Sequence, residues 1–180
     1  MMLLQEYTIT TYKKIEVNFN IMRTVVVKKT NDPEEGYETK EQLLSDTKQH
    51  IRDVGKVMDS LSYELVDRGD FHDWSKLEYF DKFARDTLER QDIPNFKDRE
   101  WYQIHTKEER HHINARVPED VNLIDIFEMI ADCVIAGKTR KGTVNNDFLI
   151  IPDEVLKDAY WNTVELVKNN IQVYTEETRE

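Results

Sequence analysis

Apolar and polar residues alternate near the start of the chain. Ile15, Val17, Phe19 and Ile21 are separated by a glutamate and two asparagines, and this period of two predicts a β-strand with one buried face. The valines at positions 25 and 27 predict a second strand. We therefore expect residues 1–36 to form a small N-terminal β-ribbon followed by a loop.

The pattern changes to helical spacing at Thr39. Thr39 and Gln42 form a capping-box pair, which marks the beginning of a helix that we expect to end near Asp67. His50 falls on or beside the apolar stripe of this helix. The stripe consists of Leu43, Leu44, Thr47, Ile51, Val54, Val57, Met58, Leu61 and Leu65.

Further helices are expected along the rest of the chain. The expected ranges are about 74–90, part of 99–104, a turn or two after 106, 122–137 and about 152–173. Capping-box pairs open two of them, Ser75 with Glu78 and Thr106 with Glu109. The pattern predicts a mainly α fold, in which residues 37–174 form a bundle of five or six helices and residues 175–180 are a frayed tail.

Composition narrows the function classes. The formal net charge of −11 argues against general nucleic-acid binding, which requires a basic surface. A single cysteine, Cys133, excludes an internal disulfide, and no apolar run has the length of a membrane span or of a signal peptide. These features predict a cytoplasmic protein that does not bind membranes.

All five histidines belong to a series of residues that can bind metal. Imidazole and carboxylate ligands together suit first-row transition metals, so we expect one or two ions of Mn, Fe, Co, Ni or Zn. A pair of such ions neutralises a phosphoester and lowers the pKa of the water that it binds. The expected ligands are His50, His72, Asp73, His105, His111, His112 and Asp132.

Neighbouring residues add to this hypothesis. Lys76 lies one helical turn after Asp73 and would hold a phosphate group. Asp132 sits in an apolar segment, where a carboxylate is costly unless it is paired or bound to metal. Glu128, one turn earlier, is either a partner for a histidine N–H or a solvated side chain. A surface helix with surplus histidines remains the alternative for His105, His111 and His112.

The order of His50, His72-Asp73 and Asp132 resembles the H…HD…D signature of the HD-domain superfamily of metal-dependent phosphohydrolases. The resemblance implies a helical bundle with the HD pair at the beginning of a helix. "HDWSK" is similar to the HD-x-x-K form of the HD-GYP cyclic-dinucleotide phosphodiesterases, in which further histidines recruit additional metal ions. The spacing of His105 and His111-His112 differs from that group, and the GYP motif is absent.

The segments "HDWSKLE", "WYQIHTKEERHH" and "NLIDIFEMIADCVIAGKTRKG" also resemble a family of small phage and bacterial proteins related to this superfamily. This resemblance covers roughly residues 47–142 and implies a fold and a metal site, but no particular substrate. It would place the protein in the host cytoplasm if a phage encodes it, as a nucleotide-metabolism or anti-defence enzyme.

These observations lead to one main functional hypothesis, a phosphatase or phosphodiesterase that hydrolyses a nucleotide or similar small phosphoester. The expected catalytic residues are Lys76, Asp73 and His112, and the expected substrate-binding residues are Lys76, Arg110, His111, Lys138 and Arg140. Two alternatives stay open, namely a non-catalytic nucleotide- or protein-binding module with a structural metal and a di-iron oxygenase. A homo-oligomer formed through the β-ribbon is a further expectation.

Overall fold

The computed structural model describes residues 22–32, 34, 36–89 and 92–175 and is mainly helical. The strand expected at residues 15–21 and residues 176–180 of the expected tail lie outside this range. The α-helices are α1 (Lys40–Asp70), α2 (Trp74–Glu78), α3 (Phe80–Leu88), α4 (Glu100–Glu108), α5 (Leu123–Lys141) and α6 (Asp153–Asn169). The shorter elements are two 3-10 turns, Phe96–Asp98 and Asn146–Leu149, and the strands β1 (Val25–Lys28) and β2 (Ile171–Tyr174). The predicted mainly α bundle with a small sheet is thus confirmed.

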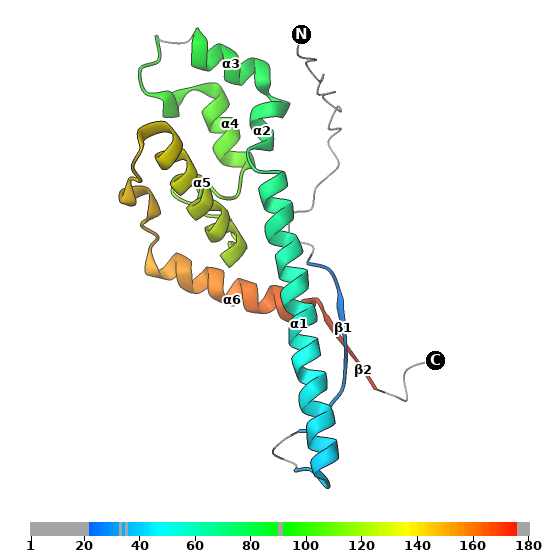
Figure 1. Cartoon of the computed structure of the whole chain (residues 1–180). Helices are drawn as coiled ribbons and strands as arrows, with labels where there is room; N and C mark the ends of the chain where they lie inside the picture. The colour runs from blue at the N-terminus through cyan, green and yellow to red at the C-terminus, as the bar shows by residue number, and fades with distance from the viewer. Residues whose placement is uncertain (1–21, 33, 35, 90–91, 176–180) are drawn as a thin grey trace, which may run out of the picture.

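The helices are arranged around the C-terminal end of α1 (Figure 1). Helices α2, α3 and α4 pack on one another beyond this end, and α5 packs against both α1 and α6. The N-terminal half of α1 extends away from the other helices, with the two strands along one side. The molecule therefore has a crowded end and an extended end.

Helix α1 begins at the predicted cap. The Thr39 side chain accepts a hydrogen bond of 3.1 Å from the backbone N–H of Gln42, and the Gln42 side chain accepts one of 3.2 Å from that of Glu38. The helix continues for 31 residues without a break. Because a helix rises about 1.5 Å per residue, His50 lies about 30 Å from the C-terminal end of α1.

The small sheet joins the two ends of the described chain. β1 pairs in parallel with β2, with Val25 opposite Ile171 and Lys28 opposite Tyr174. The strand at residues 25–28 is confirmed, but its described partner is C-terminal. The last helix, expected to end near residue 173, ends at Asn169 because the β-branched residues that follow it pair with β1.

Two predicted capping boxes are wrong. The expected helix over residues 74–90 is two helices that are interrupted at Tyr79, and Asp73 rather than Ser75 occupies the first cap position. Thr106 lies inside α4, where its hydroxyl donates to the carbonyl of Tyr102 at 2.9 Å. The segment that carries His111 and His112 is consequently a turn after α4 rather than a helix.

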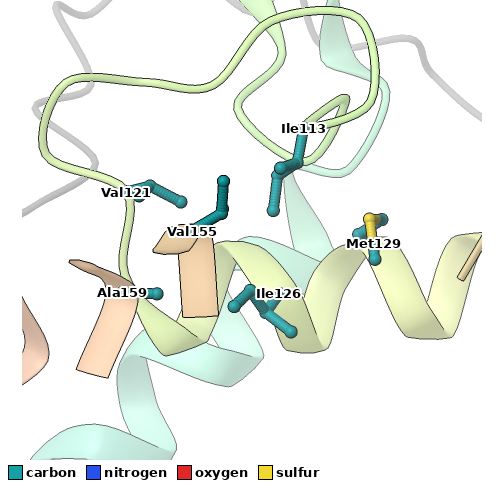
Figure 2. Packing of buried hydrophobic residues seen from close by; sticks show 6 residues of the cluster. All are labelled: Ile113, Val121, Ile126, Met129, Val155 and Ala159. Atoms are coloured by element: carbon teal, nitrogen blue, oxygen red, sulfur yellow. The ribbon is translucent and has the colours of Figure 1, made fainter. Parts of the chain in front are cut away.

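The buried apolar core holds α5 against its neighbours (Figure 2). Ile126 and Met129 on α5 face residues of the preceding loop and of α6. The cluster consists of Ile113, Val121, Ile126, Met129, Val155 and Ala159. A reciprocal capping box between Asn122 and Asp125 begins α5, and Gly142 ends it in the left-handed conformation with φ 72°. The core and the caps together fix the helix that carries Glu128 and Asp132.

In the described part of the chain, every helix is too short or too polar to be a membrane-spanning segment.

Candidate metal centre

The turn between α1 and α2 places His72 and Asp73. The backbone N–H of Phe71 closes α1 on the carbonyl of Asp67 at 3.0 Å. Asp73 then adopts the left-handed conformation, with φ 59° and ψ 22°, and it is the one non-glycine residue with positive φ among those described. Its side chain makes no capping hydrogen bond. The conformation is costly for a residue with a Cβ atom, so the turn is held by its surroundings.

Helix α4 and the turn after it supply three more histidines. His105 is buried on α4, and its Nδ1 lies 2.7 Å from the Ser75 hydroxyl. The Nε2 atoms of His105 and His112 are 2.7 Å apart. His111 is the most buried histidine, at 1% exposure. The turn after α4 therefore brings His111 and His112 back toward His105.

Helix α5 supplies two carboxylates at positions i and i+4, which share one helix face. Glu128 Oε1 lies 3.1 Å from His72 Nδ1 and 2.9 Å from His111 Nδ1. Asp132 Oδ1 lies 3.5 Å from His72 Nε2. Glu128, whose side chain is 8% exposed, is thus a histidine partner rather than a solvated side chain.

The Nε2 atoms of three histidines face the carboxylate of Asp73. Nε2 of His105 and Nε2 of His111 lie 3.3 Å and 3.8 Å from Asp73 Oδ1, and Nε2 of His72 lies 3.5 Å from Asp73 Oδ2. The opposite nitrogen, Nδ1, of each ring lies close to Glu128 or Ser75. Proteins orient metal-binding imidazoles in this way, with a polar partner on the nitrogen that does not bind the ion.

The donor atoms fall into groups that can hold a metal ion. One group joins Asp73 with the three histidines of α4 and its turn, and a second joins His72, His111 and Asp132. A third group joins Glu109, His111 and Glu128, and within each group the donor atoms lie within 4.8 Å of one another. Asp73 belongs to the first group and its Oδ2 lies 3.5 Å from His72 Nε2 of the second, while His111 belongs to all three groups.

Two members of the cluster carry buried polar atoms without a hydrogen-bond partner. These atoms are Asp73 Oδ1 and His111 Nε2, whereas the other ring nitrogen of His111 lies 2.9 Å from the Glu128 carboxylate. Buried polar atoms are almost always satisfied, since desolvation without a partner is unfavourable. The orphaned atoms belong to residues with metal-ligand chemistry, so the residues present fit a metal ion.

The electrostatics of the cluster divide the histidines into two kinds. Asp132 and Glu128 raise the pKa of His72 to about 10. Burial, with the proximity of other cations, lowers the pKa of His105 to about 3 and that of His112 to about 4. His105 and His112 are therefore neutral imidazoles at neutral pH, the form that binds metal.

The acidic members of the cluster remain charged. Burial alone would raise the pKa of Glu128, but interactions with His111, His72 and Arg68 together lower it to about 2. The contact with His72 lowers the pKa of Asp132 to about 2. Burial also opposes ionisation of Asp73, but Lys76 and the neighbouring histidines lower its pKa below the usual range.

The cluster is closed on one side and accessible on the other. His105 and His111 are buried against the protein interior. The side chains of His72, Asp73, Lys76 and Asp132 retain 22–27% exposure. Lys76 forms an ion pair with Asp73 at this accessible edge. A small molecule would therefore approach the carboxylates and Lys76 first.

Four predicted site residues lie elsewhere. His50 is exposed on α1, and the unbroken helix keeps it far from the other expected ligands, so the structure does not bring it into any of the donor groups. Lys138 and Arg140 are exposed in the last turn of α5, beyond Asp132. Arg110 forms ion pairs with Asp120 and Asp125, which make it a structural cation rather than a free phosphate ligand.

Three residues at the site were not predicted from the sequence. Arg68 joins the cluster through Glu128, at 3.1 Å, and Asp125, at 2.8 Å. Glu109 accepts a hydrogen bond of 2.9 Å from the backbone N–H of Ser75. The position of Glu109 four residues after His105 is the one sequence signal that could have indicated it. Ser75 and Arg68 have no such signal, because their partners are distant in sequence.

Comparisons with known proteins identify a family without assigning an activity. No curated protein matches the sequence, and no solved structure matches it. Residues 39–176 match the sequence model of a family described as being of unknown function, DUF5662. The match runs from the N-cap of α1 past β2, so it contains every residue of the candidate metal centre, whereas β1 precedes it. The chain is therefore a member of the family of unknown function DUF5662.

Proposed function

We propose that this protein is a metal-dependent phosphohydrolase that acts on a nucleotide or another small phosphoester. The observation that carries the proposal is the position of Asp73 between three histidines, each with Nε2 toward its carboxylate and Nδ1 near a polar partner. A carboxylate in this position can bridge two divalent ions a few Å apart, which is a recurring arrangement in phosphoester hydrolysis.

The ligands divide naturally between two ions. His72, His111 and Asp132 would hold one ion, and Asp73, His105 and His112 would hold the other. The second oxygen of Asp73 lies 3.5 Å from His72 Nε2, so this carboxylate would also lie beside the first ion. The Nε2 atoms of His105 and His112 lie at hydrogen-bond distance, 2.7 Å, and a cation bound by both rings would replace that contact, so His112 is proposed as a ligand rather than as a proton donor. In this proposal His111 would supply the imidazole that the HD signature assigns to His50.

The accessible edge suits a phosphate group. The bound ions would neutralise the phosphate charge and supply a nucleophilic water at neutral pH. Lys76, already paired with Asp73 and partly exposed, would hold a phosphate oxygen and stabilise negative charge in the transition state. Because the chain as a whole carries a net charge of −11, the ions and Lys76 are what would attract an anionic substrate to this point.

The experiment combines metal content with activity. The purified full-length protein is analysed for Mn, Fe, Co, Ni and Zn, and phosphate release is then measured over nucleoside mono-, di- and triphosphates and cyclic dinucleotides in the metal found. We expect at least one ion per chain and release from at least one nucleotide. Asp73→Asn should lower both metal content and turnover by at least about 100-fold, since even changes outside the first ligand shell cost about 10–100-fold.

The matched control is His50→Gln, which alters the one described histidine outside the cluster. This variant should retain the metal and the activity of the wild type. Stoichiometric metal with no turnover on any substrate would overturn the proposal in favour of a structural metal in a binding module. An oxygen-reactive iron pair would overturn it in favour of an oxygenase, and equal metal loss in His50→Gln and Asp73→Asn would remove the assigned site itself.

A further inference from the structure

Helix α1 exposes its apolar stripe and buries polar residues. The large apolar side chains on the exposed face retain between 43% and 64% exposure: Leu43, Leu44, Ile51, Val54, Met58 and Leu65. The buried residues of the same helix are Asp53, Ser60 and Arg68. A surface helix normally places its apolar stripe against the protein and its polar face in water, so α1 has the reverse orientation.

The polar face is fixed by specific contacts. Lys56 bonds both Asp53, at 2.7 Å, and the carbonyl of Val26 in β1, at 3.1 Å. The Ser60 hydroxyl donates to the carbonyl of Arg23 at 3.1 Å, and Arg68 binds the carboxylates of α5. Contacts along the length of α1 therefore hold this orientation, and it leaves the apolar stripe outside.

The stripe has the spacing of a two-helix seam. Leu44, Ile51, Met58 and Leu65 recur every seven residues, with Val54 and Leu61 between them at the complementary positions. A repeat of 3.5 residues per turn keeps apolar residues facing a second helix, which is the geometry of a coiled coil. The same stripe on a second copy of the chain supplies a helix of matching length and spacing.

Charge on the flanks of the stripe does not oppose self-pairing. One flank holds Lys48, Gly55, Ser62 and Gly69, and the other holds Leu43, His50, Val57 and Glu64. In a parallel pair of helices, each residue of the second flank faces a residue of the partner's first flank that lies five positions later in the sequence. None of these pairs brings together two residues of like charge. In a chain with net charge −11, α1 thus presents an apolar seam whose flanks carry one lysine and one glutamate.

Glycine at position 55 fits a close helix approach. Glycine in the interior of a helix is unfavourable, yet among the described residues no other part of the chain lies within 4 Å of a Cβ atom placed at Gly55. The available area is also sufficient. Roughly 100 Å² from each of the six exposed apolar side chains gives a buried surface of about 1,200 Å² for two copies, the lower end of specific interfaces.

We propose that α1 pairs with α1 of a second copy of this chain through the stripe from Leu44 to Leu65, forming a homodimer. The interface is separate from the metal centre and does not depend on its chemistry. It also differs from the oligomer contact expected through residues 1–36, because the polar face of α1 already holds β1.

The test measures the mass of the full-length protein by size-exclusion chromatography with light scattering over a range of concentrations. The wild type should elute at twice the chain mass of 21.5 kDa. Ile51→Glu should shift the protein to the monomer and weaken dimerisation at least about 100-fold, since it buries an unpaired charge at the centre of the seam. Circular dichroism checks that the variant remains helical.

The matched control is Ile135→Glu on α5, because Ile135 is 62% exposed and Ile51 is 64% exposed. The control should remain a dimer. If the wild type were monomeric at every concentration and Ile51→Glu lost helicity, a segment of the same chain would have to cover the stripe. That result would overturn the dimer. A dimer that Ile51→Glu leaves intact would overturn the location of the interface.

Discussion

The two ends of α1 differ in what they bury. At the C-terminal end Arg68 is enclosed between Asp125 and Glu128, and its side chain retains only 6% exposure. Farther toward the N-terminus, Ile51 and Met58 have apolar side chains of the kind found in a core, yet they are among the most exposed large side chains of the helix. Apolar periodicity thus identified the helix correctly, but it did not identify which face the fold would bury.

The difference also separates two kinds of stabilisation. The crowded end is held by buried ion pairs that have to form together, because each charge without its partner is strongly unfavourable. The extended end has a continuous apolar surface that a second molecule can cover. A helix can therefore be anchored by charge at one end and remain available for association along the other.

The largest expected effect is at the crowded end. Arg68→Ala removes the cation between two buried carboxylates and should lower the free energy of unfolding by about 3–5 kcal/mol, the range for breaking a buried ion pair. Chemical denaturation monitored by circular dichroism measures it. Arg52→Ala is the control on the same helix, since Arg52 is exposed and bonds only Gln49 among its described contacts. Equal losses in both variants would contradict the assigned role of Arg68.

A pair of methionines compares the apolar core with the stripe. Met129 is 3% exposed and Met58 is 59% exposed. Met129→Ala should lower the free energy of unfolding by about 2–5 kcal/mol through the cavity that it leaves.

Met58→Ala, measured at concentrations where the protein is monomeric, should change the free energy of unfolding by no more than about 0.5 kcal/mol. Denaturation of both variants at low and high protein concentration provides the comparison. A large loss in Met58→Ala at low concentration would mean that the stripe is already covered within one chain.

Much of the fold was predictable because its signals are local. Thr39 and Gln42 marked the beginning of α1, and the alternation at Val25 and Val27 marked β1. The sheet partner of β1 was not predictable in the same way, since its pairing with Ile171 spans almost the whole chain. The sequence predicted one helix with Ser75 as its cap, and it gave no signal for the break at Tyr79. In the structure, contacts with Glu109 and His105 determine the position of Ser75.

For the candidate metal centre, the sequence indicated which residue types would be present but only some of the individual residues. Histidines and carboxylates in one sequence indicated metal chemistry, and His72, Asp73 and Asp132 do converge. His50 was included because it preceded the pair in the expected order, but order along the chain does not limit distance when a straight helix lies between two residues. The role of Glu128 depended on which face of α5 turns inward, and that is set by packing.

The last predicted effect is a gain in stability, at the turn that leads from α1 into the candidate metal centre. Asp73 combines a left-handed backbone with a buried, unpaired carboxylate oxygen, and both are unfavourable in the metal-free protein. Asp73→Gly relieves both, so the metal-free variant should gain about 1 kcal/mol in the free energy of unfolding, although it loses a proposed ligand.

Denaturation in the presence of a chelator measures this gain. Asp73→Asn is the control, because asparagine tolerates the same backbone conformation but still leaves a buried polar group in the turn. It should therefore recover less stability than glycine does. If Asp73→Gly instead destabilised the metal-free protein, the ion pair between Asp73 and Lys76 would outweigh the strain of the turn. The contacts around Asp73 would then stabilise the fold. Asp73 would not be a residue at which the protein gives up stability for metal binding.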